Sequence, residues 1–313
     1  MKLNTPMTRR ESIKKMLRIS SGIALSATAS LASPLSAPAA KKSGMIIEGV
    51  GKTDGYSIKT LTRNVFDAAG GINRFISKGD VVVIKPNISW AKKPEFAATT
   101  NPDVLAAVVE LCREAGAKKI RIADNTIHDA RRCFALSGAG KIAKETGAEL
   151  VYPRSSMMKE MKITGNRLDG DWPVFVPLVE ADKIINLPVA KSHSLSTLTL
   201  GMKNWIGGVD GNRWGLHQNI HETIVDLARF FKPTVTLIDA IRIMTRNGPS
   251  GGSLSDVKTK NTLILSEDPV AADAVATKLF GLKPEKIGFI RLGQKRGLGT
   301  YDLDKLNKKR VVL

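Results

Sequence analysis

Lysine and histidine side chains gather in one short stretch of the sequence, residues 183–209. Lys191, Ser192 and His193 follow an apolar run, and Lys203 and Asn204 come further along. Lysine can act as a base, form a Schiff base or hold an anion, and histidine can transfer protons near neutral pH. We therefore predict that Lys191, Ser192 and Asn204 bind a ligand, and His193 and Lys203 are candidate catalytic residues.

The apolar residues around these groups predict how the chain presents them. The unbroken apolar run within 183–187 predicts a buried strand, and the lysine–histidine segment would follow it as a short loop. The residues that recur at helical spacing are Leu195, Leu198, Met202 and Trp205. They predict a helix over 196–205, whose N-terminus would favour a carboxylate or phosphate. The alternative is a surface loop whose serines cap that helix, with Lys203 simply solvated.

Polar residues also follow other predicted strands. Lys85 and Asn87 end a β-branched run, and Asp124, Asp239 and Asp268 end or follow three further strands. In parallel sheets, ligands bind outside the carboxyl ends of the strands. We therefore expect these residues at one edge of the sheet and predict that Lys85, Asn87 and Asp239 bind the ligand. Asp124 and Asp239 could instead orient a lysine, bind a cation or cap the following loop.

Two further histidines, His217 and His221, are four residues apart in a predicted helix over 216–231. This spacing places them on one helix face and is compatible with a metal site. Asp210 or Glu222 could assist. Two half-buried histidines beside an apolar stripe would give the same pattern, so both interpretations remain open.

The alternation of predicted strands and helices favours an α/β fold, with a mainly parallel sheet and helices on both faces. Asn-Gly-type and Trp-Pro turns around 161–177 predict a small hairpin insertion. Residues 45–313 are expected to form a single α/β domain.

Residues 1–39 have the composition of a signal peptide. Arg9 and Arg10 precede a weakly apolar, Ala/Ser-rich stretch, and 37–39 reads Ala-Pro-Ala, which suits a cleavage site. The pattern resembles a twin-arginine export signal, except that Ser12 stands where phenylalanine is usual. We expect an exported, periplasmic protein that uses the twin-arginine machinery and keeps no stable membrane span after cleavage. A general secretory signal and a membrane anchor are the alternatives.

The charge balance indicates acidic partners. The net charge is +19, and beyond residue 40 the chain still has 42 basic and 28 acidic residues. Such a field attracts nucleic acid, anionic lipid or acidic small molecules. With 5% aromatic residues and no nucleic-acid motif, no nucleic-acid partner is expected. Cys112 and Cys133 are too few for a cysteine-ligated iron–sulfur cluster, so we expect two ordinary thiols or one disulfide.

Several motifs occur together in a recognisable order. They are KPN at 85–87, the segment 100–124, LPVAKSHSLSTLTLGMKNWIGGV at 187–209, His217, NGPSGG at 247–252 and the run at 266–281. Over about 45–290 the chain resembles the "domain of unknown function 362" family. The resemblance implies the location of a site and no reaction. Some members of that family carry iron–sulfur modules, for which this chain lacks the cysteines.

These patterns support three hypotheses. The first is an exported enzyme, or a relative of one, that binds an anionic small molecule or cofactor in a cleft lined by lysine and histidine, with acid–base or redox chemistry. The second is a periplasmic protein that binds a ligand or metal without turnover. The third is a basic protein that docks on acidic envelope polymers or on a redox partner.

Overall fold

The structure, a computed structural model, describes residues 44–52 and 55–313. The predicted export signal at 1–39 lies outside the described residues and stays a prediction. None of the described helices is long and apolar enough to cross a lipid bilayer. Cys112 and Cys133 are buried free thiols. Burial raises the pKa of Cys112 to about 12, as expected for an ordinary, unreactive thiol.

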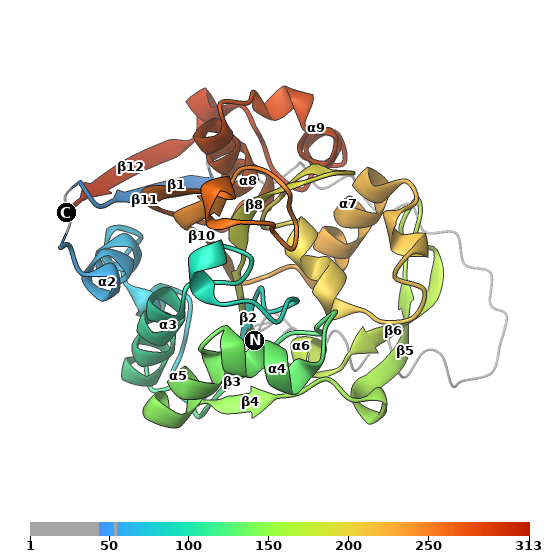
Figure 1. The fold of residues 1–313 in the computed structure, drawn as a ribbon, viewed down its shortest axis with the longest axis horizontal. Helices are drawn as coiled ribbons and strands as arrows, with labels where there is room; N and C mark the ends of the chain where they lie inside the picture. The colour runs from blue at the N-terminus through green and yellow to red at the C-terminus, as the bar shows by residue number, and fades with distance from the viewer. Residues whose placement is uncertain (1–43, 53–54) are drawn as a thin grey trace, which may run out of the picture.

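The described residues form one ten-stranded sheet, mixed but mostly parallel, and one two-stranded sheet (Figure 1). The order in the large sheet is β12-β1-β11-β10-β7-β2-β3-β4, with β8 beside β10 and β9 beside β8. Its strands are β1 (Met45–Val50), β2 (Val81–Pro86), β3 (Lys119–Ala123), β4 (Glu149–Val151), β7 (Lys183–Leu187), β8 (Val189–His193), β9 (Thr197–Thr199), β10 (Val235–Met244), β11 (Val257–Ser266) and β12 (Asn307–Val312). The predicted α/β class, with a mainly parallel sheet, is confirmed.

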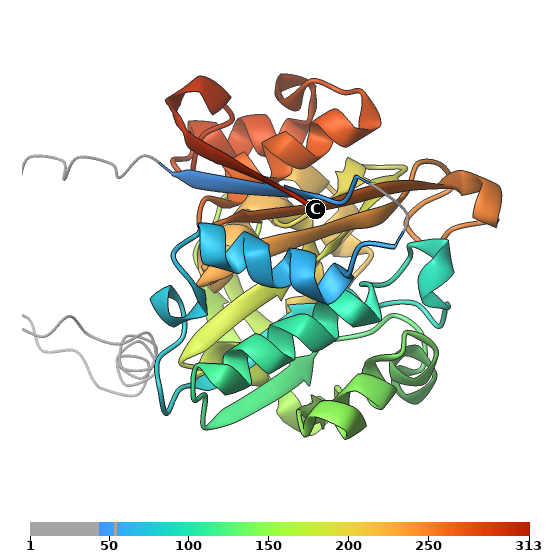
Figure 2. The same ribbon diagram turned by 90° about the vertical axis from the view of Figure 1, so that its left-hand side faces the viewer.

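Helices cover both faces of this sheet. They are α2 (Ile58–Ala68), α3 (Pro102–Glu114), α4 (Ala130–Leu136), α5 (Ala139–Thr146), α6 (Pro177–Glu180), α7 (Ile220–Phe231), α8 (Pro269–Thr277) and α9 (Gly288–Lys295). In β2, Val82 and Ile84 pack with α2, α3 and α5, whereas Val83 belongs to the core under α7, α8 and α9. The continuous β-branched run of this strand therefore reflects burial on both faces. Figure 2 shows α2 and α3 lying across the sheet.

The hairpin insertion is also confirmed. Strands β5 (Met158–Ile163) and β6 (Gly170–Phe175) pair antiparallel as the separate two-stranded sheet. Val174 and Phe175 are fully buried and join the core on the α7 side.

The segment after β7 differs from the prediction. Lys191 and His193 lie in strand β8, which continues beyond Pro188 along β10, and not in a loop. The helix predicted over 196–205 is also wrong. β9 pairs antiparallel with β8, and a short 3₁₀ helix, η4 (Lys203–Gly208), follows.

The reason lies in the burial of the side chains. Leu198, Leu200 and Met202 alternate at two-residue spacing and are buried, whereas Leu195, which began the predicted helical stripe, is 58% exposed. The β-branched Thr199 lies between Leu198 and Leu200 and favours a strand. No α-helix N-terminus is therefore available at this place to bind an anion.

The expectation that all the polar strand ends meet at one edge holds for the parallel strands only. Strand β11 runs antiparallel to β10, with Ser266 opposite Thr236. Asp268 therefore lies at the opposite edge of the sheet. There its side chain accepts hydrogen bonds from the backbone N–H groups of Ala271 and Thr300, at 2.8 and 3.0 Å, and caps α8.

Candidate functional site

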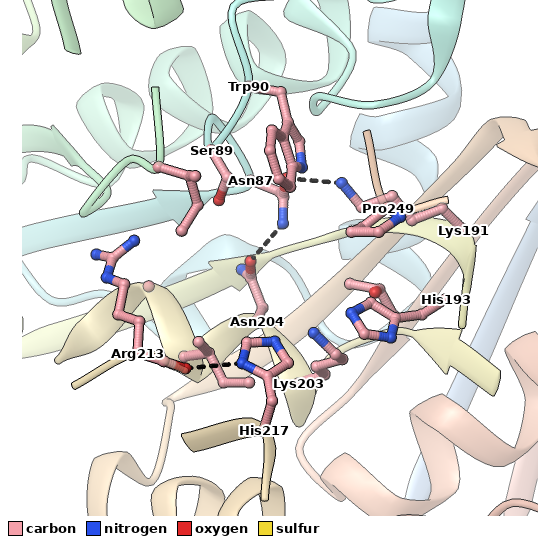
Figure 3. Close-up of a pocket in the computed structure, with 14 residues that line it drawn as sticks. Asn87, Ser89, Trp90, Lys191, His193, Lys203, Asn204, Arg213, His217 and Pro249 are labelled. Atoms are coloured by element: carbon pink, nitrogen blue, oxygen red, sulfur yellow. Dashed lines mark hydrogen bonds between the residues drawn. The ribbon is translucent and has the colours of Figure 1, made fainter. Parts of the chain in front are cut away.

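A cavity of about 140 Å³ lies beyond the carboxyl ends of β2, β3 and β7 (Figure 3). Its lining residues come from loops after the strands, from β8, β9 and η4, and from the segment before α7. They are Asn87, Ser89, Trp90, Ile127, Lys191, His193, Thr199, Lys203, Asn204, Ile206, Gly207, Arg213, His217 and Pro249. Three of these residues carry basic groups with high intrinsic pKa values, and none is acidic. A volume below the 300–1,000 Å³ of drug-sized pockets suits a small ligand.

A buried ion pair supports the floor of this cavity. Lys85 Nζ donates a hydrogen bond of 2.6 Å to Asp124 Oδ1, and the two side chains are 1% and 0% exposed. The other carboxylate oxygen of Asp124 accepts the backbone N–H of Ile88 at 2.7 Å. Asp124 thus orients a lysine, one of the predicted alternatives. Lys85 itself does not line the cavity, because its amine points to Asp124.

Because residue 207 is a glycine, the backbone of η4 can pass close to the Lys85–Asp124 ion pair. A Cβ at this position would collide with Asp124 Oδ1 and lie 2.9 Å from Lys85 Nζ. The backbone carbonyl of Gly207 also accepts the N–H of Asn125 at 3.0 Å. The absence of a side chain lets the backbone of η4 lie directly on the ends of β2 and β3.

Asn204 connects η4 to the strands. Its Nδ2 donates to Asn186 Oδ1 at 2.9 Å and to the Lys85 carbonyl at 3.2 Å. Its Oδ1 accepts hydrogen bonds from Lys85 Nζ and Asn87 Nδ2, both at 3.2 Å. Through these hydrogen bonds Asn204 fixes η4 against the ends of the strands, and it also lines the cavity.

Asp273 of α8 holds the residues just before η4. Its two carboxylate oxygens accept the backbone N–H groups of Gly201 and Met202, at 2.7 and 3.0 Å. The side chain is fully buried, and burial raises the pKa of Asp273 to about 7. Nothing in the sequence indicated this contact, because Asp273 looks like an ordinary residue of a helix.

The lysines of this region differ in their partners. Lys85 is paired with Asp124, and Lys191 Nζ donates to Asn87 Oδ1 and to the Ala98 carbonyl, at 3.1 and 2.7 Å. Lys203, 7% exposed, has no acceptor or carboxylate partner for its amine within the described part of the chain. Burial lowers the pKa of Lys203 from 10.5 to about 7, and burial together with the Lys203 charge lowers the pKa of Lys191.

His193 and His217 face each other across the cavity, with their rings stacked at a centroid distance of 5.9 Å. His193 Nδ1 accepts the backbone N–H groups of Leu195 and Ser196, so the proton of its neutral ring is on Nε2. His217 Nδ1 lies 2.8 Å from the Arg213 carbonyl and donates to it, which leaves a lone pair on Nε2. One ring therefore offers a donor and the other an acceptor.

Burial also affects the charge of both histidines. It lowers the pKa of His193 to about 3, with further contributions from Lys203, His217 and Lys191. It lowers the pKa of His217 as well, although the hydrogen bond to the Arg213 carbonyl opposes this. Both rings are therefore neutral at pH 7, and a neutral His217 can act as a base.

Two polar side chains that line the cavity, Thr199 and Arg213, were not predicted from the sequence. The Thr199 hydroxyl is buried and has no hydrogen-bond partner among the described residues. Arg213 donates to the carbonyls of Asn125 and Thr126, at 3.0 and 3.2 Å, and lies 3.8 Å from Asp210 Oδ1. Arg213 lies in an Asp-Gly-Asn-Arg turn that carries no helical or strand periodicity, so the sequence offered no signal for it.

The two histidines predicted to share a helix face do not do so. A 3₁₀ turn, η5 (Gly215–His217), ends before α7, and Asn219 between them has a left-handed backbone with φ of 52°. His217 lines the cavity, whereas His221 packs against Phe289 at a centroid distance of 6.2 Å. Across residues 44–52 and 55–313, no group of three or more His, Cys, Asp or Glu side chains could hold a metal ion. His217 and His221 therefore do not lie together on one helix face.

Two other predicted ligand-binding residues lie outside the cavity lining. The Asp239 carboxylate is buried and accepts the backbone N–H groups of Asn101 and Ile241, at 2.7 and 3.0 Å. Ser192 alternates with Lys191 and His193 along β8 and points to the other side of the strand, where its Oγ accepts the N–H of Gly248. Of the predicted residues, the structure brings Asn87, Lys191, His193, Lys203 and Asn204 together, with His217.

Comparisons with known proteins add the following. The sequence profile of the family described as "Domain of unknown function (DUF362)" matches residues 82–278. The chain is 29% identical over 262 residues to the "Thylakoid-associated protein sll1697" of Synechocystis sp., covering 77% of this chain and 76% of that protein. The lactate racemase apoprotein from Thermoanaerobacterium thermosaccharolyticum is similar with a TM-score of 0.45 and 14% identity, over 75% of this chain and 56% of the racemase chain. The family profile covers more than half of the sequence, and the chain belongs to the family described as Domain of unknown function (DUF362).

Proposed function

We propose that this protein is exported and that it binds a small organic anion in the cavity between Lys191, Lys203 and His217. The observation that carries the proposal is a cavity with three basic residues of high intrinsic pKa and no acidic lining residue. Burying a cationic amine that has no counter-charge costs free energy. This cost disfavours the protonated form and lowers the pKa of Lys203. A bound carboxylate or phosphate would supply the missing negative charge and accept from the Lys203 amine.

The neutral histidines support acid–base chemistry on that anion. The His193 Nε2–H can donate to a ligand oxygen, and the His217 Nε2 lone pair can accept a proton. The cavity volume of about 140 Å³ fits a ligand of a few carbon atoms or one charged end of a larger cofactor.

The proposal predicts a defined pH dependence of anion binding. A bound anion favours the protonated Lys203, so its pKa in the complex lies above the value of about 7 in the free protein. Affinity should be highest below pH 7 and fall up to about tenfold per pH unit above it, until the pKa of the complex is reached. The neighbouring groups, Lys191, His193 and His217, contribute to the same curve.

Isothermal titration calorimetry with lactate, pyruvate, malonate and phosphate, from pH 6 to pH 9, measures this. Lactamide, which has the shape of lactate without its charge, is the matched control and should bind at least about tenfold more weakly. Saturable binding of one anion per chain is the expected result. Binding only to long polyanions, without saturation by a small anion, would instead support docking on acidic envelope polymers.

Export through the twin-arginine route is the second part of the proposal. It is supported by Arg9 and Arg10 ahead of a weakly apolar stretch and an Ala-Pro-Ala site. Cell fractionation of the full chain should find the shortened protein in the exported fraction. The double variant Arg9→Lys, Arg10→Lys should stay inside at full length. Equal export of this variant would indicate a general secretory signal.

A further inference from the structure

The amine of Lys203 differs from the other buried lysine amines of the site in having no partner. Lys85 is held by a carboxylate, and Lys191 by an amide oxygen and a carbonyl. The described residues offer neither to Lys203, although its side chain is more than nine-tenths buried and lines the cavity. A site that only binds anions could use a lysine whose amine is held in place by neighbouring hydrogen-bond acceptors. An amine that is free to approach a ligand atom can also form a bond with it.

The groups around Lys203 suit such a bond. Figure 3 shows Lys203 lining the same cavity as His193 and His217, and the charge of Lys203 lowers the pKa of both histidines. In the free protein, burial leaves a large part of the Lys203 amines unprotonated at pH 7, and the unprotonated amine is nucleophilic. His217 Nε2 can take up a proton, and Lys191 and Arg213 remain to hold a carboxylate.

We propose that Lys203 forms an imine with the keto group of a small 2-oxo acid bound in this cavity. The inference rests on the proposed function, because the carboxylate of the acid is the bound anion. The Lys203 nitrogen attacks the keto carbon and forms a C–N bond, while the C=O π electrons move to the oxygen. His217 Nε2 accepts a proton from the attacking nitrogen and passes it to the oxygen, so that a neutral carbinolamine forms, while the Nε2–H of His193 donates a hydrogen bond to that oxygen.

The resulting carbinolamine then loses its hydroxyl group. The nitrogen lone pair forms the C=N bond, the C–O bond breaks, and His217 transfers the second nitrogen proton to the leaving hydroxyl, which departs as water. Both protons of the amine thus end in this water, and His193 and His217 are neutral again. Overall, the amine and the ketone give an imine and one water, and no oxidant or reductant is consumed.

Reductive trapping tests this step. The full chain is incubated at pH 7 with pyruvate and sodium cyanoborohydride, and peptide mapping by mass spectrometry locates the modified lysines. We expect one reduced pyruvate unit per chain on Lys203, formed at least about tenfold faster than on exposed lysines such as Lys258. Lactate, which has no keto group, should give no adduct and should slow the trapping of pyruvate.

Two variants keep the test interpretable. Lys203→Arg retains the positive charge and removes the nucleophile, so it should bind lactate without being trapped. His217→Asn retains a donor toward the Arg213 carbonyl and removes the base, so trapping should slow by about tenfold or more while pyruvate still binds. Pyruvate binding that is measured by calorimetry without trapping at Lys203 would overturn the imine alone. Failure of every small anion to bind would overturn the proposed function as well.

Discussion

The variant Lys203→Met is expected to lose anion affinity and, at the same time, to be more stable than the wild type. Losing one charged hydrogen bond should weaken binding by about 1.5–3 kcal/mol, or at least about tenfold. The folded protein disfavours protonation of Lys203, since burial lowers its pKa from 10.5 to about 7. Methionine fills the space without a charge, and the free energy of unfolding at pH 7 should rise by about 2–4 kcal/mol.

Urea unfolding and calorimetry measure the two effects. Between pH 7 and pH 10.5 the unfolded chain holds a proton on Lys203 that the folded chain has lost, so wild-type stability should rise with pH in this window. The Lys203→Met variant should lack the part of this rise in stability that comes from Lys203. Lys258→Met, at an exposed position, makes the same charge change and should alter neither property by much. A destabilised Lys203→Met protein with undiminished affinity would contradict the assigned role.

The variant Asp124→Asn should be destabilised by about 3–5 kcal/mol, because it leaves the Lys85 amine buried without a counter-charge. The asparagine can still accept the N–H of Ile88, so the loss concerns the ion pair itself. Burial lowers the pKa of Lys85, and without Asp124 nothing comparable opposes this. The folded variant then binds fewer protons than the unfolded chain, and its stability should recover as the pH rises toward 10.

Urea unfolding of three variants distinguishes this ion pair from a surface contact. Glu149→Gln removes exposed pairs with Lys119 and Arg121 and should cost less than about 1 kcal/mol. The double variant Lys85→Met, Asp124→Asn should regain most of the stability lost in Asp124→Asn, since no lone charge remains buried. Equal losses for Asp124→Asn and Glu149→Gln would show that the buried pair has no special role.

The sequence predicted the architecture well, because the burial of the strands leaves a direct trace in the residue types. The β-branched run that ends at Lys85 and the apolar run before Pro188 indicated buried strands, and both are strands in the structure. Strand direction left no such trace. The antiparallel course of β11, which moves Asp268 to the far edge, depends on a long hairpin with β10 that the local pattern does not specify.

The candidate site was located from the sequence, but its construction was not. The stretch from Lys191 to Asn204 does line the cavity, as expected from residues that follow parallel strands. It does so as two short strands and a 3₁₀ helix, because the pairing of β9 with β8 around the buried Leu198 overrides the helical spacing. Lys85 forms an ion pair because Asp124, 39 positions away in the sequence, contacts its amine. Periodicity cannot reveal such a contact.

The most direct test of the central claim is a crystal structure of the protein grown with saturating malonate or lactate. We predict density for one anion in the cavity, with a carboxylate oxygen within about 2.7–3.2 Å of Lys203 Nζ and a second polar contact to Thr199 Oγ1 or His193 Nε2. An anion bound elsewhere, with only water beside Lys203 at a concentration that saturates binding in solution, would contradict the claim.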